Sequence, residues 1–315
     1  MKIAVRVNVD PDTGYGHIFR CLNLASRLQE EGDHVVFLTN PNKLVEEHET
    51  RLISSLVGSS EELKETAEQI TDFEPEALIL DIFPEEKRAP ADYAKLIGFK
   101  GHTLSFVDSD DDFAPSHGLT INPNPLYSGH KIHSDCFHGL DYFLVNPDFH
   151  RSGHTANSVF ISMGSVDEKN DLPEILKALS LSGTKKVDIL ASPFASYAKQ
   201  IDEVFSSFSE MDIKWHEGVP SKELCRLINK AEFCITNGGN VMLEMMSLLK
   251  KVISIPSNDR LVQLTDWCAQ RQGVIACKDV SKLQNSLVDI NRFNPVEIID
   301  GKGLNRIVDL IHRKK

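Results

Sequence analysis

Two glycines and a histidine near the start of the chain form the segment best suited to chemistry. Residues 14–21 read Gly-Tyr-Gly-His-Ile-Phe-Arg-Cys. Gly14 and Gly16 permit backbone angles closed to other residues, and such a turn lets a phosphate or an incoming oxyanion approach main-chain amides. His17 would lie in the first turn of the next helix, where the helix dipole favours the neutral imidazole, which can act as a base. The alternative is a histidine that only caps or packs against the helix start.

Polar residues on the preceding strand favour the chemical interpretation. Residues 2–9 alternate in the manner of a strand, with Arg6 and Asn8 on one face near its carboxyl end. A first strand of an α/β sheet is normally apolar on both faces, so these side chains are expected to point towards the same crevice as His17. The hydrophobic period changes to that of a helix from Ile18, which predicts a strand, a loop and a helix at the start of the chain.

A second turn with two glycines, residues 236–240 (Thr-Asn-Gly-Gly-Asn), is suited to holding a diphosphate. Backbone amides at Gly239 and Asn240 would bind its oxygens, and Glu244, one helical turn further on, would accept hydrogen bonds from sugar hydroxyls. An acidic residue in a first turn also complements the helix dipole, and this alternative for Glu244 stays open. Gln263 follows the next strand and loop and is expected to contact a ligand on the glycine turn.

Polar residues also end several apolar runs in the first half. Asp81 and Asp108 each follow a run, and Asn122 opens the sequence Asn-Pro-Asn-Pro, which includes Asn124. Because α/β sheets bind ligands at the carboxyl ends of their strands, Asp81 and Asn124 are expected on the substrate side. The alternative is that such residues only end strands and begin turns.

A cluster of histidines and a cysteine raises the question of a metal site. His130, His133, Cys136 and His138 fall within nine residues. Structural zinc sites usually use Cys-x-x-Cys pairs or a cysteine pair with a distant histidine pair, and nothing matching lies nearby. A surface loop is therefore favoured, and we expect no metal and no cofactor.

The composition indicates an acidic, globular, cytoplasmic protein. Of 315 residues, 41% are hydrophobic and 25% are charged, and 34 basic against 46 acidic residues give a net charge of −12. Net charge therefore supplies no attraction to nucleic acid or to a membrane surface, although a local basic pocket is compatible with it. Six scattered cysteines and the lack of a signal peptide predict free thiols in a reducing compartment. The expected partner is a small molecule.

Strand and helix patterns alternate through both halves, which predicts an α/β protein of two Rossmann-like, doubly wound sheets facing each other across a cleft. Strands are predicted at 2–9, 34–39, 77–80, 103–107, 119–121, 142–145, 159–163, 187–191, 213–215, 233–236 and 252–255. The polar run 146–157 is the best linker, which predicts domains at 1–150 and 151–303. A helix within 304–315 would cross back to the first domain. The second half repeats the opening architecture, with Gly164 after its first strand.

These segments resemble the nucleotide-sugar hydrolases of pseudaminic acid biosynthesis, which remove UDP from a diacetamido-trideoxy-altrose. That family belongs to the glycosyltransferase B (GT-B) superfamily and is similar to the N-acetylglucosaminyltransferase of peptidoglycan synthesis. The resemblance spans nearly the whole chain, and its most specific part is Gly-x-Gly-His-x-x-Arg-Cys at 14–21. It implies that His17 activates water, that Gly238 and Gly239 receive the diphosphate, and that Glu244 holds the ribose.

Further expectations about the site follow from the matched positions. Substrate-side residues are expected to be Arg6, Asn8, Gly14, Gly16, Arg20, Asp81 and Asn124. Nucleotide-side residues are expected to be Gly164, Gly238, Gly239, Asn240, Glu244 and Gln263. The chain departs from the family pattern at Asn8, Ile82, Phe83 and Ser165, where the family usually has aspartate, histidine, tyrosine and glycine. These departures bear more on the identity of the sugar than on the type of reaction.

The predicted function is hydrolysis of a nucleotide-activated amino sugar, with a UDP-sugar favoured. His17 would take a proton from water that attacks the anomeric carbon with inversion, and the nucleotide diphosphate would leave. The sequence shows no paired carboxylates or two-metal motif for attack on phosphorus. Alternatives are a GT-B glycosyltransferase that uses a UDP-sugar donor, and a non-catalytic protein that binds nucleotide sugars.

Overall fold

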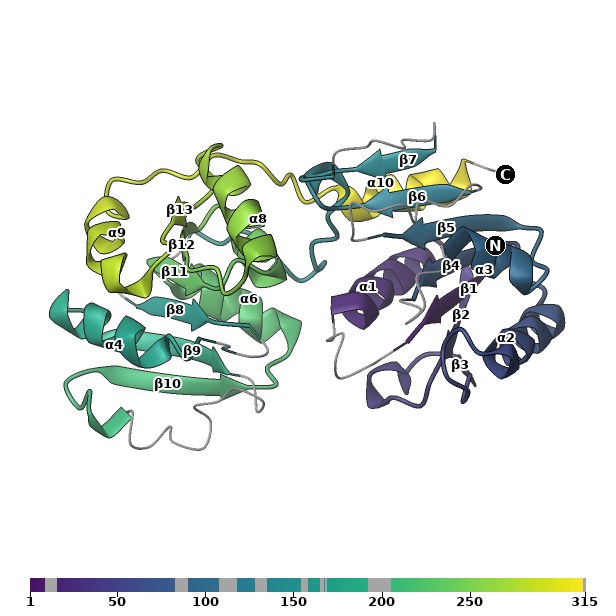
Figure 1. Ribbon diagram of the computed structural model, residues 1–315, viewed down its shortest axis with the longest axis horizontal. Coiled ribbons are helices and arrows are strands. Elements are labelled where there is room, and N and C mark those ends of the chain that lie inside the picture. The colour runs from purple at the N-terminus through teal and green to yellow at the C-terminus, as the bar shows by residue number, and fades with distance from the viewer. Residues whose placement is uncertain are drawn as a thin grey trace. The chain divides into compact units, whose positions relative to one another are not determined.

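The chain folds into two compact units, each built on one parallel sheet (Figure 1). The computed structural model describes residues 1–8, 16–82, 90–107, 118–127, 135–153, 158–164, 167, 169–191 and 205–313. The first unit comprises Met1–Leu144 and Gly301–Lys315, and the second comprises Val145–Asp300. The predicted α/β class with two parallel sheets is confirmed.

The first unit has a seven-stranded sheet in the order β3-β2-β1-β4-β5-β6-β7. These strands are β1 (Lys2–Val7), β2 (His34–Thr39), β3 (Thr50–Leu52), β4 (Ala77–Asp81), β5 (His102–Phe106), β6 (Leu119–Asn122) and β7 (Cys136–His138). All neighbours pair in parallel, and Val7 at the end of β1 lies opposite Asp81 at the end of β4. The strand order reverses between β1 and β4, so their carboxyl ends form a switch point of the kind that binds ligands in such sheets.

Alternation along β1 divides the core of this unit between the two faces of the sheet. Ile3, Val5 and Val7 pack in the cluster that holds α1 (Gly16–Glu30). Ala4 packs in the opposite cluster, with residues of α2 (Ser60–Phe73) and α3 (Pro90–Leu96). A helix on each face buries both faces of the strand, which explains why β1 is mostly apolar.

The C-terminal helix α10 (Gly303–His312) belongs to the first unit. Its buried side chains Leu304, Ile307, Val308 and Ile311 repeat at helical spacing and join the cluster formed by α1 and β1. Arg27 on α1 donates a hydrogen bond to Asn305 at 3.2 Å. The last segment of the chain therefore returns to the sheet that the first segment begins.

The second unit has a six-stranded parallel sheet in the order β10-β9-β8-β11-β12-β13. Its strands are β8 (Val159–Ser162), β9 (Lys186–Ala191), β10 (Asp212–Glu217), β11 (Phe233–Thr236), β12 (Lys251–Ser254) and β13 (Ile275–Ala276). Its helices are α4 (Leu172–Leu181), α6 (Ser221–Lys230), α7 (Asn240–Ser247), α8 (Asp259–Ala269) and α9 (Leu283–Asp289). The order reverses between β8 and β11, which places a second switch point beside the glycine turn that follows β11.

The structure differs from the sequence predictions in several places. Its described residues form three strands that were not predicted, β3, β7 and β13, and Cys136 and His138, expected in a surface loop, lie on β7. The strand predicted at 142–145 is wrong: Leu140–Tyr142 forms a 3-10 turn, and Phe143, Leu144 and Val145 are buried outside the sheet. The segment expected to be a linker begins at Asn146, whose amide donates to Ser221 of the second unit, and Arg151 donates to the carbonyl of Ser247. These bonds explain why the division falls at Val145 and not at residue 150.

Candidate functional site

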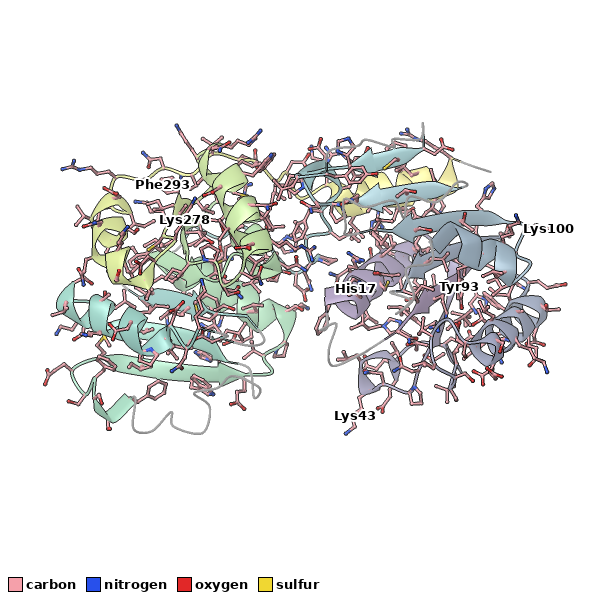
Figure 2. The ribbon with its side chains drawn as sticks, in the orientation of Figure 1. His17, Lys43, Tyr93, Lys100, Lys278 and Phe293 are labelled. Atoms are coloured by element: carbon pink, nitrogen blue, oxygen red, sulfur yellow. The ribbon has the colours of Figure 1, made fainter. Side chains whose placement is uncertain are left out.

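His17, Arg20 and Asp81 form a buried cluster at the switch point of the first unit. His17 and Arg20 are three residues apart on the first turn of α1, so they share one face of the helix. Oδ1 of Asp81 lies 2.7 Å from Nδ1 of His17 and 2.5 Å from Nη2 of Arg20, while Oδ2 accepts from Nε of Arg20 at 2.5 Å. The side chain of Asp81 is fully buried, and that of His17 is 14% exposed. Figure 2 shows His17 at the start of α1.

The Asp81 carboxylate is ionised in this setting. Burial alone would raise its pKa, but the Arg20 guanidinium and the hydrogen bonds from Arg20 and His17 outweigh that effect and bring the pKa to about 2. Cys21 Sγ lies 3.4 Å from Oδ2, and burial together with this carboxylate raises the pKa of the thiol. The guanidinium of Arg20 also lies over the ring of Phe106, 4.7 Å from its centroid. Arg20 is therefore held in place on two sides.

The charge of Asp81 fixes the tautomer of His17. An ionised carboxylate only accepts hydrogen bonds, so the 2.7 Å contact requires a proton on Nδ1, and in the neutral ring the lone pair then belongs to Nε2. Nη2 of Arg20 also lies 2.9 Å from Nδ1, but it has Oδ1 of Asp81 as its acceptor. A histidine oriented by a buried carboxylate is an arrangement that can take a proton from water or from a hydroxyl group.

Asp81 was expected to bind substrate, and the structure corrects this expectation. Both of its oxygens already accept bonds from His17 and Arg20, and the residue is 1% exposed. The sequence prediction missed the contact because His17 and Asp81 are 64 residues apart. The sequence did show that His17 and Arg20 share one helix face, and this spacing could have indicated a common partner.

Arg6 requires a second correction, because it does not point towards the crevice of His17. Its side chain is 0% exposed and lies on the face covered by α2 and α3. The guanidinium donates to Glu62 Oε1 at 2.7 Å from Nη2 and to Tyr93 Oη at 3.2 Å from Nε. It also donates to Asn8 Oδ1 at 2.6 Å. Arg6 therefore offers no surface to a substrate. Of Arg6 and Asn8, only Asn8 is partly exposed.

The remaining substrate-side predictions fall at separate places. Gly14 lies outside the described residues, as do the departures at Phe83 and Ser165. Gly16 is the exposed first residue of α1. Asn124 follows β6, where its Oδ1 accepts a hydrogen bond from the amide of Leu126 at 2.9 Å. Among the described residues, no hydrogen bond joins it to the cluster of His17, Arg20 and Asp81. Ile82 is a buried core residue, which explains why an apolar side chain is tolerated there.

The second unit brings Gly164 and Gly238 to one sheet edge. Both have positive φ angles, +82° and +88°. A Cβ on Gly164 would lie 2.5 Å from Nδ2 of Asn237, and a Cβ on Gly238 would lie 2.7 Å from Oγ1 of Thr265. Both positions therefore require glycine on two counts, the backbone angle and the close neighbour. The turns after β8 and β11 consequently lie against each other.

Helix α7 begins at this turn with amides available to an anion. Gly239 is its N-cap and makes no side-chain cap bond, and Asn240 is its first, exposed residue. The Gly239 amide itself lies 3.4 Å from Oδ1 of Asn237, at the long end of hydrogen-bond distances. The start of a helix without a capping side chain is suited to a phosphate group.

Glu244 lies on α7, one turn beyond that helix start. It forms no ion pair with the described residues, and burial raises its pKa to about 7 although part of the side chain stays accessible. The alternative that Glu244 merely complements the helix dipole is weakened, because it lies past the first turn, which has no acidic residue. Hydrogen bonds from neutral hydroxyl groups would stabilise the ionised form of this buried carboxylate.

Three more residues lie at this edge of the second sheet: Gln263, which was predicted, and Lys169 and Thr236, which were not. Gln263 is exposed on α8, two residues after Leu261, whose carbonyl would lie 3.5 Å from a Cβ on Gly238. Lys169 donates to the carbonyl of Pro256 at 2.8 Å, which brings a cation that the sequence prediction missed. The fully buried Thr236 Oγ1 at the end of β11 has no hydrogen-bond partner. A single lysine or threonine has no sequence pattern that would place it at this edge, so Lys169 and Thr236 could not be predicted.

The described residues form neither a metal-binding cluster nor a membrane-spanning helix. Across the ranges given above, no group of three or more histidine, cysteine, aspartate or glutamate residues could hold a metal ion. Cys136 and His138 lie on β7, and the other two histidines of that cluster fall outside those ranges. Among the same residues, no helix is long and apolar enough to cross a membrane.

Comparisons with known proteins place the fold. No protein-family model matches the chain. An uncharacterized protein of Methanocaldococcus jannaschii is 21% identical over 283 residues, which are 82% of this chain and 56% of that protein. The chain thus spans about half the length of this curated relative.

Solved structures give a fuller match. MurG of Acinetobacter baumannii is 14% identical with a TM-score of 0.66 and covers 99% of this chain and 100% of its own. The UDP-GlcNAc 2-epimerase of Methanocaldococcus jannaschii is 14% identical, with a TM-score of 0.67 and the same coverage. The spinosyn rhamnosyltransferase SpnG, complexed with thymidine diphosphate, is 13% identical with a TM-score of 0.61 and covers 99% of this chain and 96% of its own. The chain therefore has the two-domain GT-B fold.

Proposed function

We propose that this protein hydrolyses a nucleotide sugar, with a UDP-linked amino sugar as the favoured substrate. The observation that carries the proposal is the contact of 2.7 Å between Nδ1 of His17 and the ionised, buried Asp81. This contact supports a base at Nε2, where a proton could be taken from an attacking water. The names of the structural neighbours, which include an epimerase of UDP-GlcNAc, support a nucleotide sugar as the ligand class.

The second unit would hold the nucleotide. In the proposed scheme the helix start at Gly239 and Asn240 faces the diphosphate, and Glu244 accepts hydrogen bonds from the ribose hydroxyls. Amides at the helix start would offset the negative charge that develops on the diphosphate as it leaves. Water would attack the anomeric carbon opposite this group, which gives inversion and a free sugar. This chemistry fits the resemblance to pseudaminic acid hydrolases.

Transfer to an acceptor is the second candidate. The same histidine and aspartate would deprotonate a hydroxyl group as well as water. The likeness to the rhamnosyltransferase SpnG favours this alternative at the level of fold.

One assay separates the candidates. The protein is incubated with a panel of UDP-, dTDP- and CMP-sugars, first without an acceptor and then with pooled sugar acceptors. We expect free sugar and nucleoside diphosphate without an acceptor, and none with His17→Asn. Turnover only with an acceptor supports transfer, and saturable binding without turnover supports a binding protein. Either result would replace hydrolysis as the function.

A further inference from the structure

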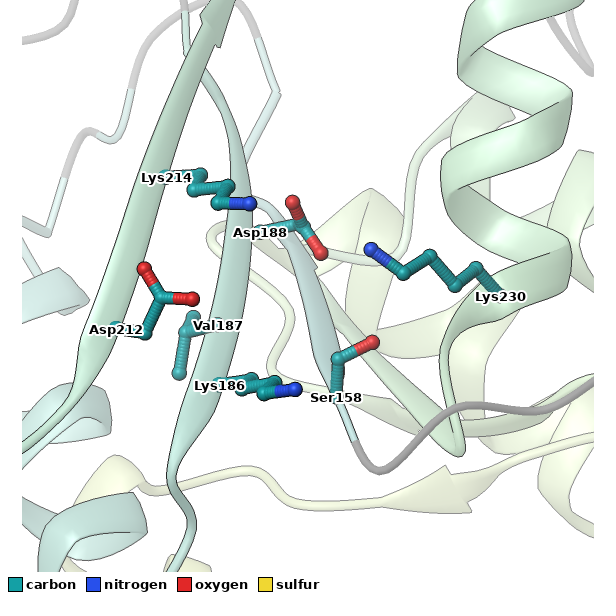
Figure 3. Close-up of a pocket in the computed structure, with 7 residues that line it drawn as sticks. All are labelled: Ser158, Lys186, Val187, Asp188, Asp212, Lys214 and Lys230. Carbon is teal, nitrogen blue, oxygen red and sulfur yellow. The ribbon is translucent and has the colours of Figure 1, made fainter.

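A cavity lies at the amino edge of the sheet of the second unit (Figure 3). Its volume is about 60 Å³, and it is lined by Ser158, Lys186, Val187, Asp188, Asp212, Lys214 and Lys230. Lys186 and Asp212 are the first residues of β9 and β10 and lie opposite each other, and Ser158 directly precedes β8. The glycine turns follow the strands at their other ends, so this cavity is separate from the proposed nucleotide site.

Three lysines give the cavity its positive charge. Lys186 and Lys214 project from β9 and β10, and Lys230 is the last residue of α6. None of the three forms an ion pair within 4.0 Å in the described parts of the chain. In Figure 3 the amino groups of Lys214 and Lys230 point towards Asp188 from two sides, and that of Lys186 points towards Ser158. The lining also holds two carboxylates, Asp188 and Asp212, so the three lysines leave one net positive charge around this space, which attracts an anion.

Ser158 supplies independent evidence for a ligand. Its side chain is nearly fully buried, at 2% exposed, and its Oγ has no hydrogen-bond partner. Buried hydroxyl groups are normally satisfied, and an orphaned one calls for an explanation such as an ion or a water molecule. Because Ser158 lines the cavity and its hydroxyl faces Lys230 and Asp188 in Figure 3, a ligand there would receive that bond.

Asp188 determines which kind of anion can bind in the cavity. It is 4% exposed, and its Oδ1 lies 2.8 Å from Nε2 of His216, which holds the carboxylate in place. A carboxylate repels a fully deprotonated anion but accepts a hydrogen bond from one that carries a proton. Near neutral pH, inorganic phosphate carries a P–OH group and sulfate does not. A lining of three lysines and two carboxylates, of which Asp188 is held by His216, therefore favours phosphate over sulfate.

We propose that this cavity, which we name the amino-edge pocket, binds inorganic hydrogen phosphate. The lysines offset its charge, the Ser158 hydroxyl donates a hydrogen bond to one oxygen, and Asp188 accepts a hydrogen bond from its P–OH group. The size agrees, since a water molecule needs roughly 10–15 Å³ in the same measure and 60 Å³ suits an ion of four oxygens better than a nucleotide. The proposal does not depend on the reaction at His17.

Calorimetric titration of the full chain with sodium phosphate, and with sodium sulfate at the same ionic strength, tests the proposal without any nucleotide sugar. We expect saturable phosphate binding and at least about tenfold weaker sulfate binding. Lys214→Met and Lys230→Met should each weaken phosphate binding about tenfold, and Ser158→Ala about threefold. Lys222→Met, on α6 but outside the cavity lining, is the matched control and should leave the affinity unchanged. Asp188→Asn should reduce the preference for phosphate over sulfate.

Three results would overturn the proposal. The first is no saturation up to about 10 mM phosphate. The second is equal binding of sulfate and phosphate. The third is the same loss in Lys222→Met as in Lys230→Met, which would show only general attraction to the surface. Thermal unfolding of each variant establishes that an altered affinity comes from the pocket and not from a disturbed fold.

Discussion

Nδ1 of His17 lies 2.7 Å from Oδ1 of Asp81, and this contact joins the first turn of α1 to the end of β4. Val7 lies opposite Asp81 in the sheet, so the contact is at the switch point between β1 and β4. The carboxylate serves both the histidine and Arg20, and it is therefore the centre of the cluster.

Replacing His17 by asparagine should remove turnover while the nucleotide still binds. The proposed base lies on the first unit and the proposed nucleotide contacts lie on the second. A lost general base should lower kcat by at least about a hundredfold. Initial rates and calorimetry with UDP measure the two effects. Near-normal turnover in a folded variant would remove His17 from the mechanism.

Asp81→Asn should reduce kcat by about a hundredfold or more, because the neutral amide no longer fixes the proton on Nδ1 of His17. It should also change acid stability. The folded pKa of about 2 lies below the ordinary value of 3.8, so this carboxyl stabilises the fold above pH 4 and loses that effect as the pH falls to 2. The contribution is about 2–3 kcal/mol.

Urea unfolding of wild type and Asp81→Asn between pH 6 and pH 3 measures this difference. The gap in unfolding free energy should narrow as the pH falls. Arg20→Met combined with Asp81→Asn is the control, since it removes the buried cation that the single variant leaves unpaired. A gap that is constant over this pH range would contradict the assigned ion pair.

Glu244 should release a proton when a nucleotide binds. Its pKa of about 7 is above the ordinary 4.5, so between these values the folded protein holds more protons than the unfolded chain, and its stability falls as the pH rises. Ribose hydroxyls favour the ionised form, so UDP affinity should rise from pH 6 to pH 8. Glu244→Gln should remove the excess proton release and weaken binding about tenfold.

Calorimetry of UDP binding in two buffers with different ionisation enthalpies counts the protons released. The titration of UDP itself is common to wild type and Glu244→Gln, so their difference reports Glu244. Equal proton release in both proteins, with affinities within twofold, would support a role for Glu244 limited to the helix.

Hydrolysis in oxygen-18 water should place the label in the released sugar. This result follows from attack on the anomeric carbon, and the sugar should first appear with inverted configuration. Mass spectrometry locates the label, and NMR during the first minutes of reaction gives the configuration. Label in the nucleotide would mean attack on phosphorus and would contradict the proposed role of His17.

Gly238→Ala should destabilise the protein more than Gly183→Ala. The two glycines have similar φ angles, +88° and +83°, so both alanines carry the left-handed backbone cost of about 1–2 kcal/mol. Only at Gly238 would the added Cβ also meet a neighbour, Oγ1 of Thr265 at 2.7 Å. Chemical denaturation measures both, and UDP affinity should fall only in Gly238→Ala. Equal destabilisation would show that the turn has room for a side chain.

The sequence by itself determined the features that depend on local periodicity. Alternation at residues 2–7 specifies a strand, and the change of period at Ile18 specifies α1, because each pattern shows which side chains share a face. The order of strands and helices likewise indicates two parallel sheets, since parallel strands need crossover connections. The glycine turn at 238 could be recognised because its backbone angle is a local property.

Tertiary structure decided which polar residues meet. Alternation showed that Arg6 differs in face from Val5, but only the packing of α2 and α3 buries Arg6 against Glu62. Asp81 became the partner of His17 because β4 pairs with β1, a pairing between residues distant in sequence. The apolar run 142–145 stayed outside the sheet because burial alone does not provide a neighbouring strand. Local patterns give each residue its face, whereas long-range pairing of backbones chooses what that face contacts.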